Sequence, residues 1–81
     1  MITVAQLKAA RNLLEWNQHQ LADASGVAIS TIKKIESKGG PLRANARSVW
    51  KLEAAIKDAG VVFIDENGGG AGVRLKDRGS R

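Results

Sequence analysis

The residue types that could do chemistry concentrate in one short segment, residues 29–34. Ile29, Ser30, Lys33 and Lys34 are spaced so that a helix would carry all of them on a single side. That side would combine an apolar group with a hydroxyl and two ammonium groups, which donate hydrogen bonds and attract anions. The pattern indicates a surface that binds an anionic ligand rich in hydrogen-bond acceptors.

Residues for catalysis or metal binding are not brought together by this sequence. His19 is the only histidine and the chain has no cysteine, so neither a metal site nor a thiol nucleophile is expected. The acidic residues Glu15, Asp23, Glu53 and Asp58 fall on separate predicted helices or on solvated faces. No nucleophile, base and orienting group can be combined from them, so we expect no enzyme activity, no metal and no cofactor.

The composition describes one small soluble domain with an excess of positive charge. The chain has 81 residues and a net charge of +5, and 43% of its residues are hydrophobic. Its longest apolar run, residues 60–64, is too short to span a bilayer, and residues 1–8 lack the layout of a signal peptide. Together with the absence of cysteine, these features predict a cytoplasmic protein without a membrane partner.

The positive charge gathers around residues 29–34 and the segment that follows. The basic residues of this region are Lys33, Lys34, Lys38, Arg43 and Arg47. A basic face suits a polyanion such as double-stranded DNA. Charge alone leaves open a solvated face that binds no partner.

Two helices are expected before this segment. The first covers residues 4–15, where Thr3 and Gln6 have the spacing of a capping box. The second starts after Asn17, which has the same spacing to Gln20, and stops at a glycine, Gly26. The intervening Trp16 is expected to pack in the core where these two helices meet.

Two further helices are expected around the basic residues. One covers residues 28–37 and buries Ile32 and Ile35; the other is capped by Asn45 and runs to about residue 59, before Gly60. Trp50 lies beside the apolar side of this last helix and fits either the rim of the core or a subunit interface.

The chain changes character after Gly60 and predicts a β-hairpin. Residues 61–64 are β-branched and aromatic, residues 65–72 are rich in turn formers, and residues 73–76 alternate apolar and basic. The glycine loop lacks the lysine and hydroxyl residue that end a phosphate-binding loop, so we interpret it as the hairpin tip. Residues 77–81 are expected to be disordered.

The hairpin is the predicted dimerisation element. Its first strand is apolar on both faces and needs cover on both, which the preceding helix could supply on one side and a second subunit on the other. The residues predicted for this interface are Val62, Phe63, Ile64, Val73 and Leu75.

The segment 17–36 resembles the helix-turn-helix of the lambda-repressor/Cro-like (XRE) family of transcription regulators. The resemblance covers about residues 7–60 and rests on Gln18, Leu21, Ala22, Gly26, Val27, Ile32, Ile35 and Glu36. Ala28 and Ile29 depart from the family pattern, because relatives more often carry small polar residues there. The resemblance implies a mainly α fold, a four-to-five-helix lambda-repressor-like DNA-binding domain over residues 1–60, followed by the hairpin of residues 61–76.

The resemblance also implies roles for individual residues. Arg11 and Glu36 would form a structural ion pair, and the helix of residues 28–37 would enter the major groove of DNA. Lys34 would read a guanine, and Ile29 would lie against a thymine methyl. The remaining predicted DNA contacts, to bases or to phosphates, are Gln18, Ser30, Thr31, Lys33, Lys38, Arg43 and Asn45.

The sequence therefore predicts a bacterial-type, sequence-specific transcription regulator that binds an inverted repeat as a homodimer. One alternative is a protein-interaction module, such as an antitoxin or antiactivator, that binds another regulatory protein with the same fold. Another is a nonspecific nucleic-acid binder driven by charge alone.

Overall fold

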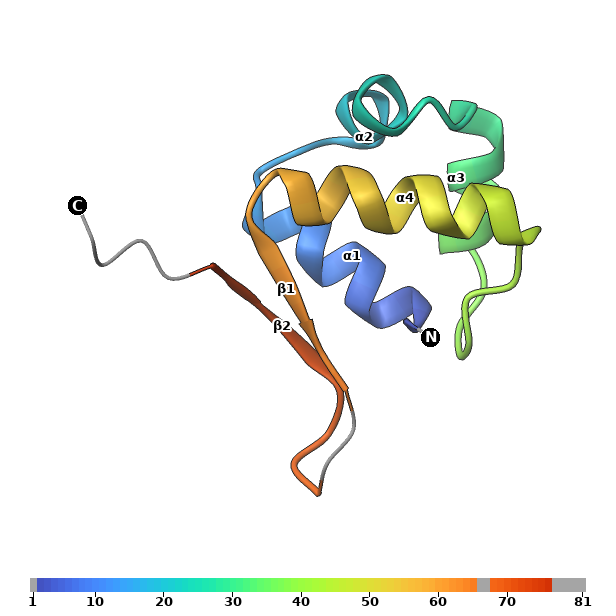
Figure 1. The fold of residues 1–81 in the computed structure, drawn as a ribbon. Helices are drawn as coiled ribbons and strands as arrows, with labels where there is room; N and C mark the ends of the chain where they lie inside the picture. Colours follow the sequence, from blue (N-terminus) through green and yellow to red (C-terminus); the bar gives the residue numbers. More distant parts are fainter. Residues whose placement is uncertain (1, 66–67, 77–81) are drawn as a thin grey trace.

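The computed structural model describes residues 2–65 and 68–76, which form four helices and a two-stranded antiparallel hairpin (Figure 1). The elements are α1 (Val4–Leu13), α2 (Gln18–Ser25), α3 (Ile29–Glu36), α4 (Ala46–Asp58), β1 (Val61–Ile64) and β2 (Gly72–Leu75). The expected mainly α fold with a C-terminal hairpin is confirmed. The predicted disorder of residues 77–81 lies outside the described residues.

Both predicted capping boxes are present. The Gln6 backbone N–H donates to the Thr3 hydroxyl, and the Thr3 N–H donates to the Gln6 side chain. Asn17 and Gln20 repeat the arrangement at the start of α2, with both bonds 2.8 Å long. Each box satisfies two backbone donors that an open helix end would leave free, so the local sequence defines where α1 and α2 begin.

Helix α1 ends at Leu13, earlier than the expected Glu15. The chain leaves the helix because Glu15 adopts a left-handed conformation with a φ of 58°. The Glu15 N–H donates to the Asn12 carbonyl and the Trp16 N–H to the Arg11 carbonyl, both at 3.0 Å. This is a Schellman termination in which a glutamate occupies the position usually held by glycine.

The turn between α2 and α3 follows the expectation from Gly26. Its φ of 78° is left-handed, and its N–H donates to the Ala22 carbonyl. Helix α3 is one residue shorter at each end than expected, with Ala28 as its N-cap and Ser37 as its C-cap. Because alanine has no side-chain acceptor, α3 begins without a side-chain cap.

The core lies between the four helices and the base of the hairpin. Its largest fully buried side chains come from α1, α2, α3 and α4, and are Leu7, Leu21, Ile32, Leu52 and Ile56. Trp16 is half-buried and packs against this core, as predicted for the corner between α1 and α2. The interdigitated apolar sides hold α3 against the rest of the domain.

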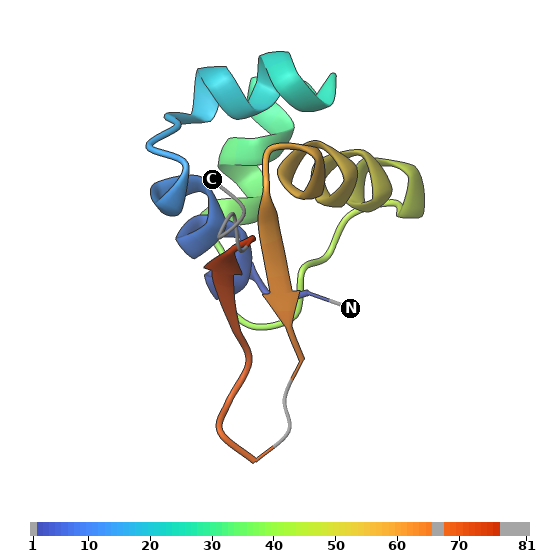
Figure 2. The same ribbon diagram turned by 60° about the vertical axis from the view of Figure 1, so that its left-hand side comes forward.

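The hairpin packs on the helices through one of its faces. Figure 2 shows β2 beside α1 and β1 beside α4, with the tip extending away from the helices. Val61 is buried, and Phe63 and Val73 pack against the core. The preceding helix, α4, contacts β1 as expected, and α1 contacts both strands.

The hairpin is also tied to α1 by Gln6. Its side-chain Nε2 donates to the carbonyls of Ile64 and Gly72, each at 3.0 Å. Strand β2 begins at Gly72 and ends at Leu75, one residue earlier than predicted at both ends. The pairing of Ile64 with Gly72 sets this register. None of the helices in the described part of the chain is long and apolar enough to cross a membrane.

Candidate nucleic-acid interface

Helix α3 separates its side chains into a buried and an exposed side. Ile32 and Ile35 are buried in the core, whereas Ser30, Lys33 and Lys34 are exposed. Ile29 and Thr31 are half-buried at the margins of the exposed side. This orientation follows from the helical spacing of the apolar residues, and it presents the polar and basic side to solvent.

The orientation of α3 is fixed by a hydrogen-bonded ion pair at its C-terminal end. Arg11 Nε donates to Glu36 Oε2 at 2.9 Å, and Arg11 Nη2 donates to Glu36 Oε1 at 2.8 Å. The Glu36 side chain is 5% exposed. Arg11 Nη1 also donates to the Trp16 carbonyl at 3.0 Å, so the guanidinium joins α1, the α1–α2 connection and α3. The ion pair expected for Arg11 and Glu36 is confirmed.

Gln18 belongs to the same network. Its Nε2 donates to Glu36 Oε1 at 3.0 Å, which places its carboxamide between the start of α2 and the end of α3. A primary amide has two N–H donors, so one of them stays available to another acceptor. No feature of the sequence predicts this contact of Gln18 with Glu36.

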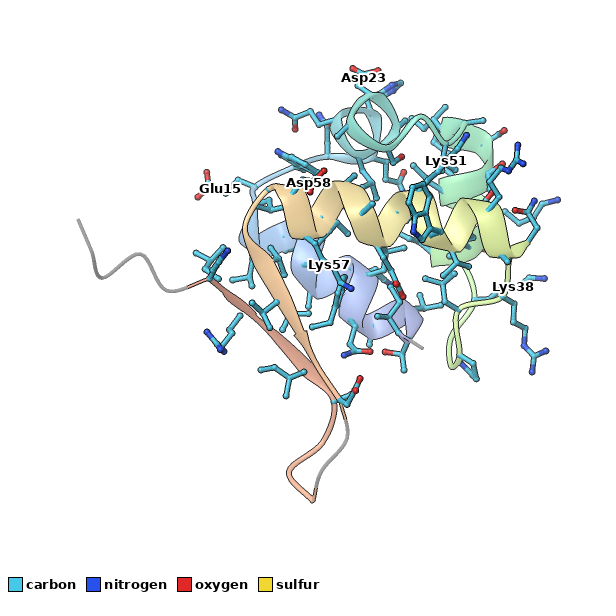
Figure 3. All side chains as sticks on the ribbon, in the orientation of Figure 1. Glu15, Asp23, Lys38, Lys51, Lys57 and Asp58 are labelled. Carbon is cyan, nitrogen blue, oxygen red and sulfur yellow. The ribbon has the colours of Figure 1, made fainter. Side chains whose placement is uncertain are left out.

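A groove of about 330 Å³ lies between α3, the α3–α4 connection and the first turns of α4. Several predicted DNA-contact residues line it, namely Ser30, Thr31, Lys34, Lys38, Arg43 and Asn45. Figure 3 shows the Lys38 side chain extending outward from the α3–α4 connection. The structure therefore gathers predicted contact residues from α3, the α3–α4 connection and the N-cap of α4 around one groove.

The charged residues that line the groove are all basic. Lys34, Lys38 and Arg43 supply its charges, and no aspartate or glutamate is among its lining residues. Within the described residues, Arg11 and Glu36 make the one ion pair, so these three cations have no anionic partner there. Cations in a concave site raise the local concentration of anions, so the groove is suited to phosphate groups.

Asn45 and Ser48 define the wall of the groove formed by α4. Asn45 Oδ1 accepts a hydrogen bond from the Ser48 N–H at 2.8 Å and so caps α4, as predicted. Ser48 also lines the groove, and it is not among the contacts predicted from the sequence. Its place in the first turn of the capped helix was the available signal, since N-terminal turns of helices attract anions.

The remaining predicted contacts lie outside this groove. Lys33 is on the exposed side of α3, and Ile29 lines a separate open hollow beside the α2–α3 turn, together with His19. Among the residues that the structure describes, there is no cluster of three or more histidine or acidic side chains that could hold a metal ion.

The part of the chain that forms and supports the groove resembles a known protein family. Residues 7–57 match the model of a family described as helix-turn-helix. The match spans most of α1, all of α2 and α3, and nearly all of α4, which are the elements that build and support the basic groove. No curated protein matches the chain.

Proposed function

Because the chain belongs to the lambda-repressor-like helix-turn-helix family of DNA-binding regulators, we propose that it binds specific operator sequences as a homodimer and regulates transcription in the cytoplasm. The observation that carries this proposal is the exposed polar and basic side of α3 beside the electropositive groove. A motif helix that is buried on one side and basic on the other suits the major groove of DNA.

The exposed side of α3 supplies the groups that would read bases. Lys34 can donate to the O6 and N7 acceptors of guanine, and Ile29 can contact a thymine methyl. Ser30 and Thr31 can bond a base or a phosphate, and Lys33 adds charge along the same helix. Because Lys34 also lines the groove, it stands between the base-reading side of α3 and the residues assigned to phosphates.

The groove would hold the DNA backbone next to the bases that α3 reads. Lys38 and Arg43 offer charge-assisted hydrogen bonds to phosphate oxygens, and the Asn45 amide offers neutral ones. Gln18 can give its second amide hydrogen to a phosphate while the first stays on Glu36. These contacts would set the position of α3 without reading sequence themselves.

We further propose that the hairpin pairs two copies on an inverted repeat. Phe63 and Val73 pack against the chain's own core, and strand alternation places Val62 and Ile64 on the opposite face. Leu75, which is 46% exposed, ends β2. Val62 and Ile64 would therefore make the direct contact. Phe63 and Val73 would support it from within, and Leu75, which pairs with Val61 on the inner face, would lie at the edge of the interface. Two recognition helices would then read half-sites about 34 Å apart.

The experiment that tests this function is selection of bound duplexes from a random DNA pool. A palindromic consensus, with half-site centres separated by about one helical turn, is the expected result. Recovery of unrelated sequences would indicate a nonspecific binder, and failure to retain DNA would favour the protein-interaction alternative. Repeating the binding at several salt concentrations would count the phosphate contacts.

A further inference from the structure

Helix α4 exposes a tryptophan that neither the core nor the DNA-binding surface uses. Trp50 is 69% exposed, more than any other large apolar side chain described. It borders an open apolar hollow lined by Ala44, Ala46 and Val49, with Glu53 at its edge. An exposed tryptophan beside an apolar hollow is typical of a protein-binding surface, because its large apolar area gains most from burial.

The residues around Trp50 are arranged symmetrically along α4. Arg47 precedes Trp50 by the same spacing at which Glu53 follows it. Ala46 and Ala54 occupy the next matching positions outward. Helical spacing places all of them on the side that carries Trp50, and none of them is buried. We call these five residues the Trp50 face.

We propose that the Trp50 face binds the same face of a second copy, with the two α4 helices antiparallel and a two-fold axis at Trp50. In such a pair, Arg47 lies level with Glu53 of the second copy, and Glu53 lies level with its Arg47. The indoles meet at the axis, and the small Ala46 and Ala54 side chains let the helices approach closely. Opposite charges face each other twice, which is the self-complementarity that a two-fold interface requires.

Charge complementarity also explains why a second copy fits better than another occupant. A partner of one charge sign would satisfy either Arg47 or Glu53 and would be repelled by the other. Neither of these side chains has an ion-pair partner within the described part of the chain, so both are available. An inverted copy places an opposite charge before each of them.

This contact is separate from the pairing proposed for the hairpin and needs no DNA. The two surfaces together would let dimers associate with one another. Ala44 lines both the hollow beside Trp50 and the basic groove, so a copy bound at the Trp50 face would lie next to the proposed phosphate contacts. Self-association measured without DNA therefore tests this inference independently of the DNA-binding function.

The test is a charge-reversal series on the full chain, followed by sedimentation equilibrium without DNA. Arg47→Glu alone, or Glu53→Arg alone, places like charges opposite each other and should weaken association by about tenfold or more. The double variant carrying both changes restores opposite charges and should recover the association of the unmodified chain. Trp50→Ala alone should also weaken association, because it removes the indole that meets its copy at the axis.

Lys8→Glu on α1 serves as the matched control, since it changes the same charge on an exposed side chain of another helix. Thermal unfolding of each variant confirms that it is folded. The inference is overturned if the unmodified chain stays monomeric, if the single reversals associate as it does, or if the double variant stays as weak as the singles. Self-association that requires the hairpin but does not change with the charges at Arg47 and Glu53 would also overturn the inference. That result would not contradict the proposed DNA binding.

Discussion

Arg11 and Glu36 form a bidentate ion pair that joins α1 to the end of α3, with N–O distances of 2.9 and 2.8 Å. Gln18 donates to the same carboxylate, and the remaining Arg11 nitrogen donates to the Trp16 carbonyl. No buried side-chain nitrogen or oxygen of this network lacks a hydrogen-bond partner, and Glu36 stays buried. The network therefore connects the C-terminal end of α3 to α1 and to the start of α2.

Removing the arginine should destabilise the domain. Arg11→Met keeps an apolar stem but leaves the buried Glu36 carboxylate without its cation, so the free energy of unfolding should fall by about 3 kcal/mol. Urea denaturation measures the loss. The double variant Arg11→Met, Glu36→Gln removes the charge as well and should lose less. Equal losses in the two variants would show that packing of the arginine, rather than the unpaired carboxylate, accounts for the effect.

Replacing Glu15 should stabilise the domain. Its φ of 58° places a side chain in the left-handed region, which costs an ordinary residue about 1–2 kcal/mol. Glu15→Gly should therefore raise the free energy of unfolding by about 1 kcal/mol, which corresponds to about 4–8 °C in Tm. Differential scanning calorimetry gives the shift. Glu15→Ala is the control, because it removes the charge and keeps the Cβ; an equal gain there would assign the effect to charge.

Removing the Lys34 ammonium should weaken specific DNA binding. Lys34→Ala should cost about 1–3 kcal/mol on the selected operator and relax the preference at one base position. A titration by fluorescence anisotropy on the operator and on its single-base variants measures both effects. Lys8→Ala removes the same charge from α1 and should change little. If Lys34→Ala weakened binding equally on operator and random DNA, the lysine would contact phosphate and not a base.

Charges placed on the outer face of the hairpin should weaken pairing through it. Val62 and Ile64 lie opposite the face that packs on the helices, so Val62→Lys with Ile64→Lys should lower self-association and leave the thermal unfolding temperature nearly unchanged. Sedimentation velocity reports the association. Arg74→Ala is the control, because it changes a side chain on the same face without adding a charge, and it should not lower self-association. Unaltered sedimentation of the lysine variant would exclude this face as the interface.

The Lys34 prediction and the hairpin prediction separate two parts of the proposed function. If the hairpin variant loses self-association but still binds a single half-site, the hairpin serves only to pair two copies. If Lys34→Ala lowers specific binding while self-association persists, α3 serves only to recognise the bases. Both outcomes together describe a regulator in which one element reads the DNA and another sets the number of half-sites.

The sequence by itself determined the local features of this protein. Both capping boxes, the Gly26 turn and the two sides of α3 follow from residues within a few positions of one another, whose hydrogen bonds and helical spacing act locally. Arg11 and Glu36 lie far apart in the chain, and their pairing was predicted because of the family resemblance and not from their spacing.

Only the tertiary structure decided which distant residues share a site. It placed Lys34, Arg43 and Asn45 in one groove, drew Gln18 into the Glu36 network, and set the hairpin on α1 through Gln6. Those contacts depend on how far and at what angle the elements pack, which no local pattern encodes. The left-handed Glu15 has the same origin, because packing of Trp16 and the Arg11 network hold the chain in a turn that glutamate alone disfavours.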